Sequence, residues 1–247
     1  MATLEIEIVV DSAGELVRAG RWDRAVRLLD VTEPADRHEA GALAIARAEA
    51  EVDQAFWTRR EANASLLGLA RSLAADAAQA WAADFAQLRA SYAPQLFVKV
   101  AGGQPATAEL AATAQRLAEQ APNPPARAYA TFYRGLIAGV LGNDDAAAEA
   151  HYQAALDTDD EYVRSYALRH LGWVADEAGR HDEALEMWRE STRLRQRAGF
   201  VPGVLAQLVV QEGGATPIVA GWADALGIGA TISAVSATEP EVARDPA

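Results

Sequence analysis

The amino-acid sequence predicts an all-α fold built from antiparallel helix hairpins, and three observations lead to this prediction. Alanine, leucine, glutamate, arginine and glutamine are abundant, and these residues favour helices. Apolar residues recur at intervals of three and four along most of the chain, which is the spacing of one helix face. Glycine and proline interrupt this pattern at short intervals, so each helix is expected to turn back on the one before it.

Composition and charge restrict the classes of partner. The chain has 247 residues and a formal net charge of −13, which argues against a nucleic acid partner because phosphate groups require a basic surface. No apolar run approaches the ~20 residues that cross a bilayer, so no membrane partner is expected. The absence of cysteine excludes disulfides and thiolate metal sites. The acidic N-terminus lacks a signal-peptide pattern, and we expect a cytoplasmic protein. Lys99 is the only lysine, and every other Lys or Arg position is an arginine.

The N-terminal part of the chain is expected to contain four helical segments after a short lead-in. Residues 4–8 alternate between apolar and acidic side chains like a strand, but no second strand is predicted for them to pair with. We therefore expect residues 1–10 to be an unpaired lead-in segment or the start of a helix. Gly20 separates the first two helices. The expected segments are 11–19, 21–30, 37–60 and 62–91.

The C-terminal part begins after the clearest expected break in the chain, the segment 92–107 with Pro94, Pro105 and two glycines. Helical segments are then expected at 106–120, 126–141, 144–157, 161–178 and 181–198 and, more weakly, at 203–212 and 216–227. Small and charged residues over 229–247 indicate a disordered tail. The folded domain is accordingly expected to span residues 11–228.

Two segments of the chain form a repeat with an offset of 37 residues. Small residues occupy four matched pairs of positions, which are Gly135 and Gly172, Gly142 and Gly179, Ala147 and Ala184, and Ala154 and Ser191. Two helices approach closely only where one of them offers a small residue at the contact. Large residues should fill the space beside these crossings, with Leu171 on the first helix and Trp188 on the second. In the upstream unit the same alignment places His151 at the position of Trp188.

On these residues the sequence resembles the tetratricopeptide repeat family, a solenoid of ~34-residue helical hairpins. The clearest units are 128–161 and 165–198, and residues 14–29 carry a weaker echo. The sequence departs from the family pattern where Trp, Tyr and Pro are preferred, and it has Leu168, Ala175 and Gln196 instead. The resemblance implies a right-handed superhelix of stacked hairpins. The region 37–121 fits the repeat poorly, so it is either a set of longer hairpins of the same kind or a separate helical bundle.

The resemblance also implies a concave groove lined by the first helix of each hairpin. Carried over position by position, the groove includes Gly139 and Val140, and the residues expected to bind a partner are Tyr129, Phe132, Leu136, Tyr166, Arg169, Trp173, Asp176 and Glu177. Tyr, Trp and Arg are the residue types that contribute most to binding energy in interfaces. The alternative for each aromatic residue is that it packs against a neighbouring hairpin. The lysine-and-asparagine clamp with which some members of this family bind acidic C-termini is absent.

The function predicted from the sequence is non-enzymatic binding of a peptide or protein partner, as an adaptor or scaffold. A homo-oligomeric scaffold that uses the same surface is the first alternative, and an all-α enzyme with acidic metal-binding clusters is the second. Two acidic clusters, at 144–145 and 157–161, stand at expected helix starts, where capping explains them. The helix beginning at His38 resembles a zinc-binding HExxH motif, but Ala42 replaces the second histidine. We therefore expect no metal and no cofactor.

Overall fold

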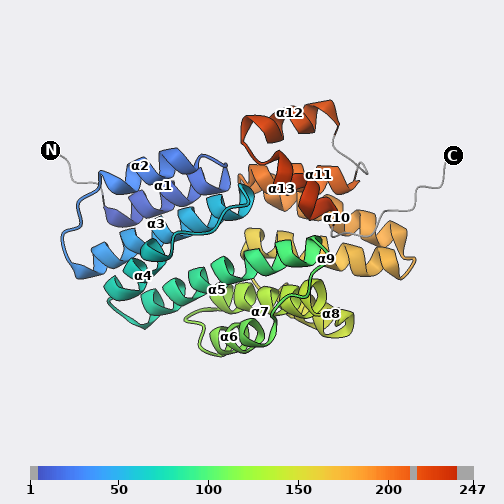
Figure 1. The fold of residues 1–247 in the computed structure, drawn as a ribbon, viewed down its shortest axis with the longest axis horizontal. Coiled ribbons are helices and arrows are strands. Elements are labelled where there is room, and N and C mark those ends of the chain that lie inside the picture. Colours follow the sequence, from blue (N-terminus) through green and yellow to red (C-terminus); the bar gives the residue numbers. More distant parts are fainter. Residues whose placement is uncertain (1–4, 212–215, 238–247) are drawn as a thin grey trace.

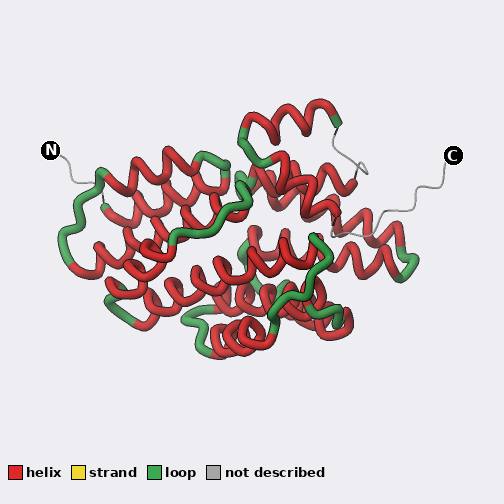
Figure 2. Tube along the Cα trace, viewed as in Figure 1, coloured by secondary structure: helices red, strands yellow, loops and turns green. Residues whose placement is uncertain are grey.

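Residues 5–211 and 216–237 are described by the computed structural model, and this part of the chain is helical without any strand (Figures 1 and 2). The predicted all-α fold class is confirmed. The helices are α1 (Ile6–Arg18), α2 (Trp22–Asp30), α3 (Arg37–Trp57), α4 (Ala64–Leu73), α5 (Ala77–Val100), α6 (Ala108–Glu119), α7 (Pro124–Leu136), the π-helical turn η1 (Ile137–Leu141), α8 (Asp145–Ala154), α9 (Glu161–Glu177), α10 (His181–Arg197), α11 (Val201–Gln211), α12 (Pro217–Ala225) and α13 (Gly229–Ala237).

Helices that follow one another in sequence pack as antiparallel neighbours, as the glycine and proline joints predicted. The pairs α1–α2, α3–α4, α7–α8 and α9–α10 are in direct contact, and α5 packs on α3, α4 and α6. The region 37–121 is not set apart from the rest, because Phe85 and Leu88 of α5 belong to the same buried cluster as Phe132 of α7 and Leu171 of α9.

The expected single helix over 62–91 is two helices, and α5 continues into the expected break at 92–107 as far as Val100, after which residues 101–107 are non-helical as predicted. Asp76 starts α5 by accepting a hydrogen bond from the Gln79 backbone amide (2.9 Å), and the Gln79 side chain accepts one from the Ala75 amide (2.9 Å). This reciprocal capping separates α4 from α5. Pro94 lies inside α5 although proline removes one helical hydrogen bond. Burial of Tyr92 and other apolar residues on both sides of Pro94 offsets that loss.

Both ends of the folded region are longer than expected. Helix α1 begins at Ile6, so the unpaired lead-in expected for residues 1–10 is wrong from that residue onward and the alternative, the start of a helix, is confirmed there; residues 1–4 lie outside the described ranges. The predicted tail at 229–247 is wrong for its first part, because α13 is helical and Ile232 is buried. Residues 238–247 lie outside the described ranges. The composition of α13 is small and neutral, and its packing on α3, α5, α11 and α12 gives it a place in the fold.

Helices from the N-terminal part of the chain contact helices from its C-terminal part. Helix α13 contacts α3 and α5, and Arg18 at the end of α1 donates a hydrogen bond to the backbone carbonyl of Ala198 at the end of α10 (3.2 Å). Trp22 of α2 shares a buried cluster with Phe200 and Ile228 from the C-terminal region. In Figure 1 the helices from both ends of the colour scale accordingly lie next to each other above α5 and α9. The interior is therefore bounded by both halves of the chain.

The two repeat units differ by one residue, which the π-helical turn η1 accommodates. A Cβ atom on Gly172 would lie 2.3 Å from Nε1 of Trp188, and one on Gly135 would lie 2.4 Å from Cε1 of Tyr152. Tyr152 therefore occupies the position of Trp188, and the alignment that placed His151 there is wrong. The glycines are 37 residues apart and the aromatics 36, because η1 adds one residue to the first helix of the upstream unit. The same shift makes Asn143, and not Gly142, the equivalent of Gly179. Asn143 and Gly179 both have a positive φ, of 58° and 76°.

The close approach at Gly172 leads to a prediction about helix crossing. Gly172→Ala should lower the free energy of unfolding by about 1–3 kcal/mol, because the added methyl group pushes α9 away from the Trp188 ring. The matched control is Gly68→Ala in α4, where an added Cβ meets nothing within 4 Å. The control should gain up to about 1 kcal/mol because alanine is the better helix former. Urea titrations followed by circular dichroism compare the two variants, and equal effects would contradict the prediction.

Candidate functional site

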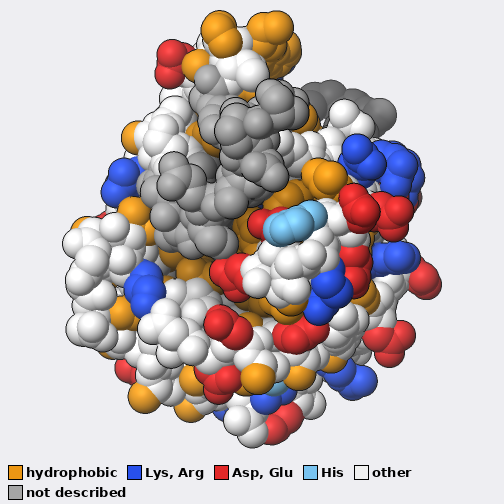
Figure 3. Space-filling model, turned by 90° about the vertical axis from the view of Figure 1, so that its right-hand side faces the viewer, with side chains coloured by type: hydrophobic (Ala, Val, Ile, Leu, Met, Phe, Trp, Pro, Cys, Tyr) orange, Lys and Arg blue, Asp and Glu red, His pale blue; other side chains and the backbone are white. Residues whose placement is uncertain are grey.

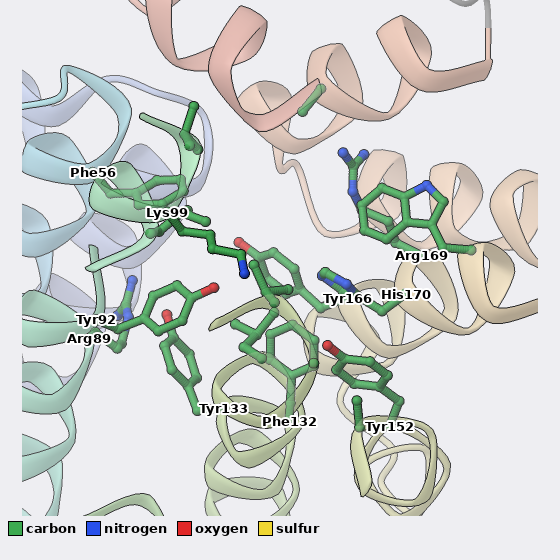
Figure 4. Close-up of a pocket in the computed structure, with 18 of the residues that line it drawn as sticks. Phe56, Arg89, Tyr92, Lys99, Phe132, Tyr133, Tyr152, Tyr166, Arg169 and His170 are labelled. Atoms are coloured by element: carbon green, nitrogen blue, oxygen red, sulfur yellow. The ribbon is translucent and has the colours of Figure 1, made fainter. Parts of the chain in front are cut away.

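A cavity lined by aromatic side chains lies inside the arrangement of hairpins and has a volume of about 550 Å³ (Figure 4). Its wall comes mainly from α3, α5, α7 and α9, while α11 contributes Ala206 and the residue before α11 is Phe200, which also lines the cavity. The π-helical turn η1 contributes Gly139 and Val140, and α8 and α10 contribute a few side chains. Residues from sequence positions between 52 and 206 thus meet around one space.

Aromatic side chains dominate the wall of this cavity. The ring of Tyr166 lies 5.2 Å from that of Phe132 and 5.5 Å from that of Phe200, and the His170 ring stacks on Tyr152 at 4.9 Å. Offset and edge-to-face contacts at such distances are the favourable arrangements for aromatic pairs. Nine of the chain's Phe, Trp and Tyr residues line the cavity, which is more than half of them; they are Phe56, Trp57, Tyr92, Phe132, Tyr133, Tyr152, Tyr166, Trp173 and Phe200.

On one side of the cavity a buried carboxylate connects three helices. Asp53 of α3 accepts a hydrogen bond from Nε1 of Trp22 (2.8 Å), and its other oxygen lies 3.6 Å from the guanidinium of Arg89 on α5. Burial raises the pKa of Asp53, and the Arg89 charge and the indole donors oppose that rise. Arg89 in turn hydrogen-bonds the Tyr133 hydroxyl, which stays protonated because burial raises the pKa of Tyr133. Asp53 and Arg89 therefore offset each other's charge.

On the opposite side two arginines flank a histidine. Arg169 donates a hydrogen bond to the side-chain oxygen of Gln207 on α11 (3.0 Å) and lies 4.8 Å above the Trp173 ring. The Arg195 guanidinium lies over the Tyr166 ring at 5.1 Å. Burial, together with the charges of Arg169 and Arg195, holds the pKa of His170 well below its usual value. His170 is therefore neutral at neutral pH and presents an uncharged ring to the cavity.

Lys99 lies near the end of α5 and reaches into the cavity (Figure 4). Its ammonium donates a hydrogen bond to the side-chain oxygen of Asn143 (2.8 Å), which follows η1. Because Asn143 is uncharged, this contact leaves the charge of Lys99 without compensation. Within the described ranges, no salt bridge includes Lys99.

Most of the predicted binding residues do line this cavity, but several are less exposed than a groove requires. Those that line it are Phe132, Leu136, Tyr166, Arg169, Trp173 and Glu177, together with Gly139 and Val140. The expected exposure is wrong for Phe132, Leu136 and Arg169, which are 1%, 8% and 3% exposed. Arg169 is covered because α11 packs beside α9 and supplies Gln207 as its partner.

Two predicted residues fall outside the cavity wall. The Tyr129 ring packs edge-on against Phe85 (4.9 Å), behind the wall formed by Tyr133. Asp176 pairs with His181 at the start of α10, with 2.6 Å between carboxylate oxygen and ring nitrogen. Both contacts join neighbouring helices. For Tyr129 this agrees with the alternative stated from the sequence, in which an aromatic residue packs against a neighbouring hairpin.

Sequence reasoning missed the residues from the poorly matching region 37–121 and from α10. These are Asp53, Arg89, Lys99 and Arg195, with Tyr133 of α7. A signal was present, because Asp53 stands four residues before Trp57 and Arg89 stands four after Phe85, on the apolar faces of their helices. A charged residue in such a position is either paired or exposed to an internal space.

Comparison with known proteins gives no relative of this chain: no family model, no curated protein and no solved structure matches it. In the part of the chain that the structure describes, no three His, Asp or Glu side chains are grouped so that they could hold a metal ion. None of the helices in the same ranges combines the length and hydropathy that a membrane span requires.

Proposed function

We propose that this protein is a non-catalytic binding module that takes up a short peptide segment, or another ligand of similar size, in its inner cavity. The observation that carries the proposal is the aromatic cavity of about 550 Å³ bounded mainly by α3, α5, α7 and α9. Ligand sites typically measure ~300–1,000 Å³ and combine an apolar wall with a few polar groups. A cavity of this size admits a chain segment or a small molecule but not a folded partner.

We further propose that the hairpins form a closed variant of the tetratricopeptide superhelix. Recurrence of one crossing geometry supports this, because Gly135 meets Tyr152 in one unit as Gly172 meets Trp188 in the next. Contacts of the C-terminal helix α13 with α3 and α5 distinguish this arrangement from an open groove. The expected concave groove is then an internal site with a limited opening. Figure 3 shows acidic side chains around a recess with a hydrophobic interior on one face of the molecule.

The two alternative functions have less support. A homo-oligomer that used the groove residues would need them on the surface, yet Phe132 and Arg169 are buried. An acidic metal-dependent enzyme would need free carboxylates, yet Asp144 accepts a hydrogen bond from the Ala147 amide (3.1 Å) and Asp160 caps the start of α9. Capping accounts for these residues without a metal ion.

Blocking the cavity tests the proposed function. Val174 of α9 lines the cavity and is partly exposed, so Val174→Trp should fill part of the space. The control is Ile218→Trp on α12, where the side chain is 75% exposed. Each protein is incubated with a library of short peptides and small metabolites, separated by gel filtration and analysed for bound species by mass spectrometry. We expect wild type and Ile218→Trp to retain the same ligands, and Val174→Trp to lose them.

Two outcomes would contradict the proposal. Equal retention by Val174→Trp would place the binding site outside the cavity. No retained ligand on any of the three proteins, with unchanged melting temperatures, would show that the cavity does not bind molecules of this size.

A further inference from the structure

The cavity also indicates the chemical class of its ligand, and this inference rests on the function proposed above. We infer that the ligand carries a planar aromatic group next to an anionic group, and that Lys99 binds the anion. The shared chemistry can come from a small aromatic acid or from a peptide whose last residue is aromatic. Three features of the cavity carry the inference: its aromatic wall, its distribution of charge and the position of Lys99.

The wall suits a flat apolar group. Tyr166, Phe132 and His170 present rings from α7 and α9, and Tyr92 presents one from α5 on the opposite side (Figure 4). Burial raises the pKa of the cavity tyrosines, including Tyr92 and Tyr166, so their hydroxyls remain uncharged. Neutral rings on two sides favour stacking with a planar ligand.

The distribution of charge along the cavity wall favours Lys99 as the site for an anion. Arg195, which also lines the cavity, donates a hydrogen bond to the backbone carbonyl of Gly203 (2.6 Å) and lies over the Tyr166 ring. Asp53 and Arg89 face each other at 3.6 Å, and Arg169 is held by Gln207. The acidic residues Asp145 and Glu177 line the wall as well. Burial raises the pKa of Glu177, and repulsion by the carboxylates of Asp145 and Asp176 raises it further. An anion is therefore repelled from that part of the wall and attracted to Lys99, whose hydrogen-bond partner Asn143 is neutral.

Lys99 is placed to complete the aromatic site. It stands one helical turn after Leu96 and two turns after Tyr92, and all three line the cavity from α5. An ammonium has three donors, and Asn143 accepts one of them. In a space partly shielded from water, an anion on the remaining donors gains more than it would at an open surface.

A pair of fluorescent probes with one aromatic skeleton tests the inference. 8-Anilinonaphthalene-1-sulfonate carries a sulfonate, and N-phenyl-1-naphthylamine lacks it; both become more fluorescent in apolar sites. We expect wild type to bind the sulfonate about tenfold more tightly than the neutral probe, as one charge-assisted contact would provide. Lys99→Gln should remove this preference and leave affinity for the neutral probe unchanged, while Lys99→Arg should keep it. Equal binding of both probes by wild type, or an unchanged preference in Lys99→Gln, would overturn the inference.

The cavity-blocked variant separates this inference from the proposed function. If Val174→Trp weakens both probes but wild type shows no preference for the sulfonate, the cavity binds ligands and the assignment to Lys99 is wrong. If neither probe binds wild type, or Val174→Trp affects neither, the proposed function fails as well. Circular dichroism and melting temperature establish that each variant is folded.

Competition experiments distinguish the two sources of the ligand. N-Acetylphenylalanine and a tetrapeptide ending in phenylalanine are each tested for displacement of the sulfonate probe, as free acids and as C-terminal amides. Displacement by both free acids supports a small aromatic acid, and displacement by the tetrapeptide acid alone supports a chain terminus. Equal displacement by acids and amides would overturn the role of the anion. Because Lys99 is the only lysine, acylation of its amine reports on one side chain, and ligand binding should slow that reaction.

Discussion

Trp188→Ala is expected to lower the free energy of unfolding by about 3–5 kcal/mol, the range for a buried aromatic residue reduced to alanine. Trp188 is 2% exposed, and its ring fills the crossing between α9 and α10 beside Gly172. Its Nε1 atom also donates a hydrogen bond to the backbone carbonyl of Arg169 (3.0 Å), which would lose a partner. Urea titration followed by circular dichroism at 222 nm measures the loss.

Two variants control for this substitution. Trp222→Ala on α12 removes the same side chain from a position that is 55% exposed, and it should cost less than about 1 kcal/mol. Trp188→Phe keeps most of the ring volume but removes the Nε1 donor, so its loss of unfolding free energy should lie between those of Trp222→Ala and Trp188→Ala. If Trp188→Ala were no more destabilising than Trp222→Ala, the crossing geometry described for α9 and α10 would be wrong.

Asp53→Leu is expected to have a comparable effect, about 3–5 kcal/mol, because it leaves the buried charge of Arg89 without its carboxylate. The Asp53 and Arg89 side chains are 7% and 13% exposed. The Trp22 indole would also lose its acceptor, which weakens the attachment of α2 to α3.

A double-mutant cycle identifies the cause of this loss. Arg89→Leu combined with Asp53→Leu removes both charges, and the double variant should be more stable than Asp53→Leu alone by at least about 1 kcal/mol. Asp53→Asn keeps one acceptor for Trp22 and removes the charge, so it should fall between wild type and Asp53→Leu. A double variant that is less stable than Asp53→Leu would show that volume, and not unpaired charge, sets the cost.

The helices and their pairing could be predicted from the sequence because both depend on neighbours along the chain. Apolar residues at intervals of three and four define one face of a helix, and Gly179 follows one helix five residues before the apolar face of the next begins at Ala184. The contact between Gly172 and Trp188 joins positions only sixteen apart, so a small residue matched with a large one already indicates the crossing.

The errors arose where packing outweighed a local signal. Pro94 favours a break, yet α5 continues because apolar residues before and after Pro94 are buried. The extra residue in η1 has no marker in the sequence, so the alignment assigned His151 the place that Tyr152 occupies. Both outcomes depend on the free energy of burying side chains against other helices, which no local pattern expresses.

The candidate site shows the same division. The groove pattern identified the faces of α7 and α9, and six of its eight residues line the cavity. It could not show that Arg169 is covered by α11, or that Asp53 and Lys99 come to face α9 across the same space. Those relations depend on contacts between helices that are not consecutive in sequence, such as α3 with α5 and α13 with α3 and α5. The small neutral residues of α13 give no pattern of their own, and its place in the fold depends on packing against α11 and α12 and on contacts with the much earlier helices α3 and α5, such as the hydrogen bond from Thr231 to the carbonyl of Phe56.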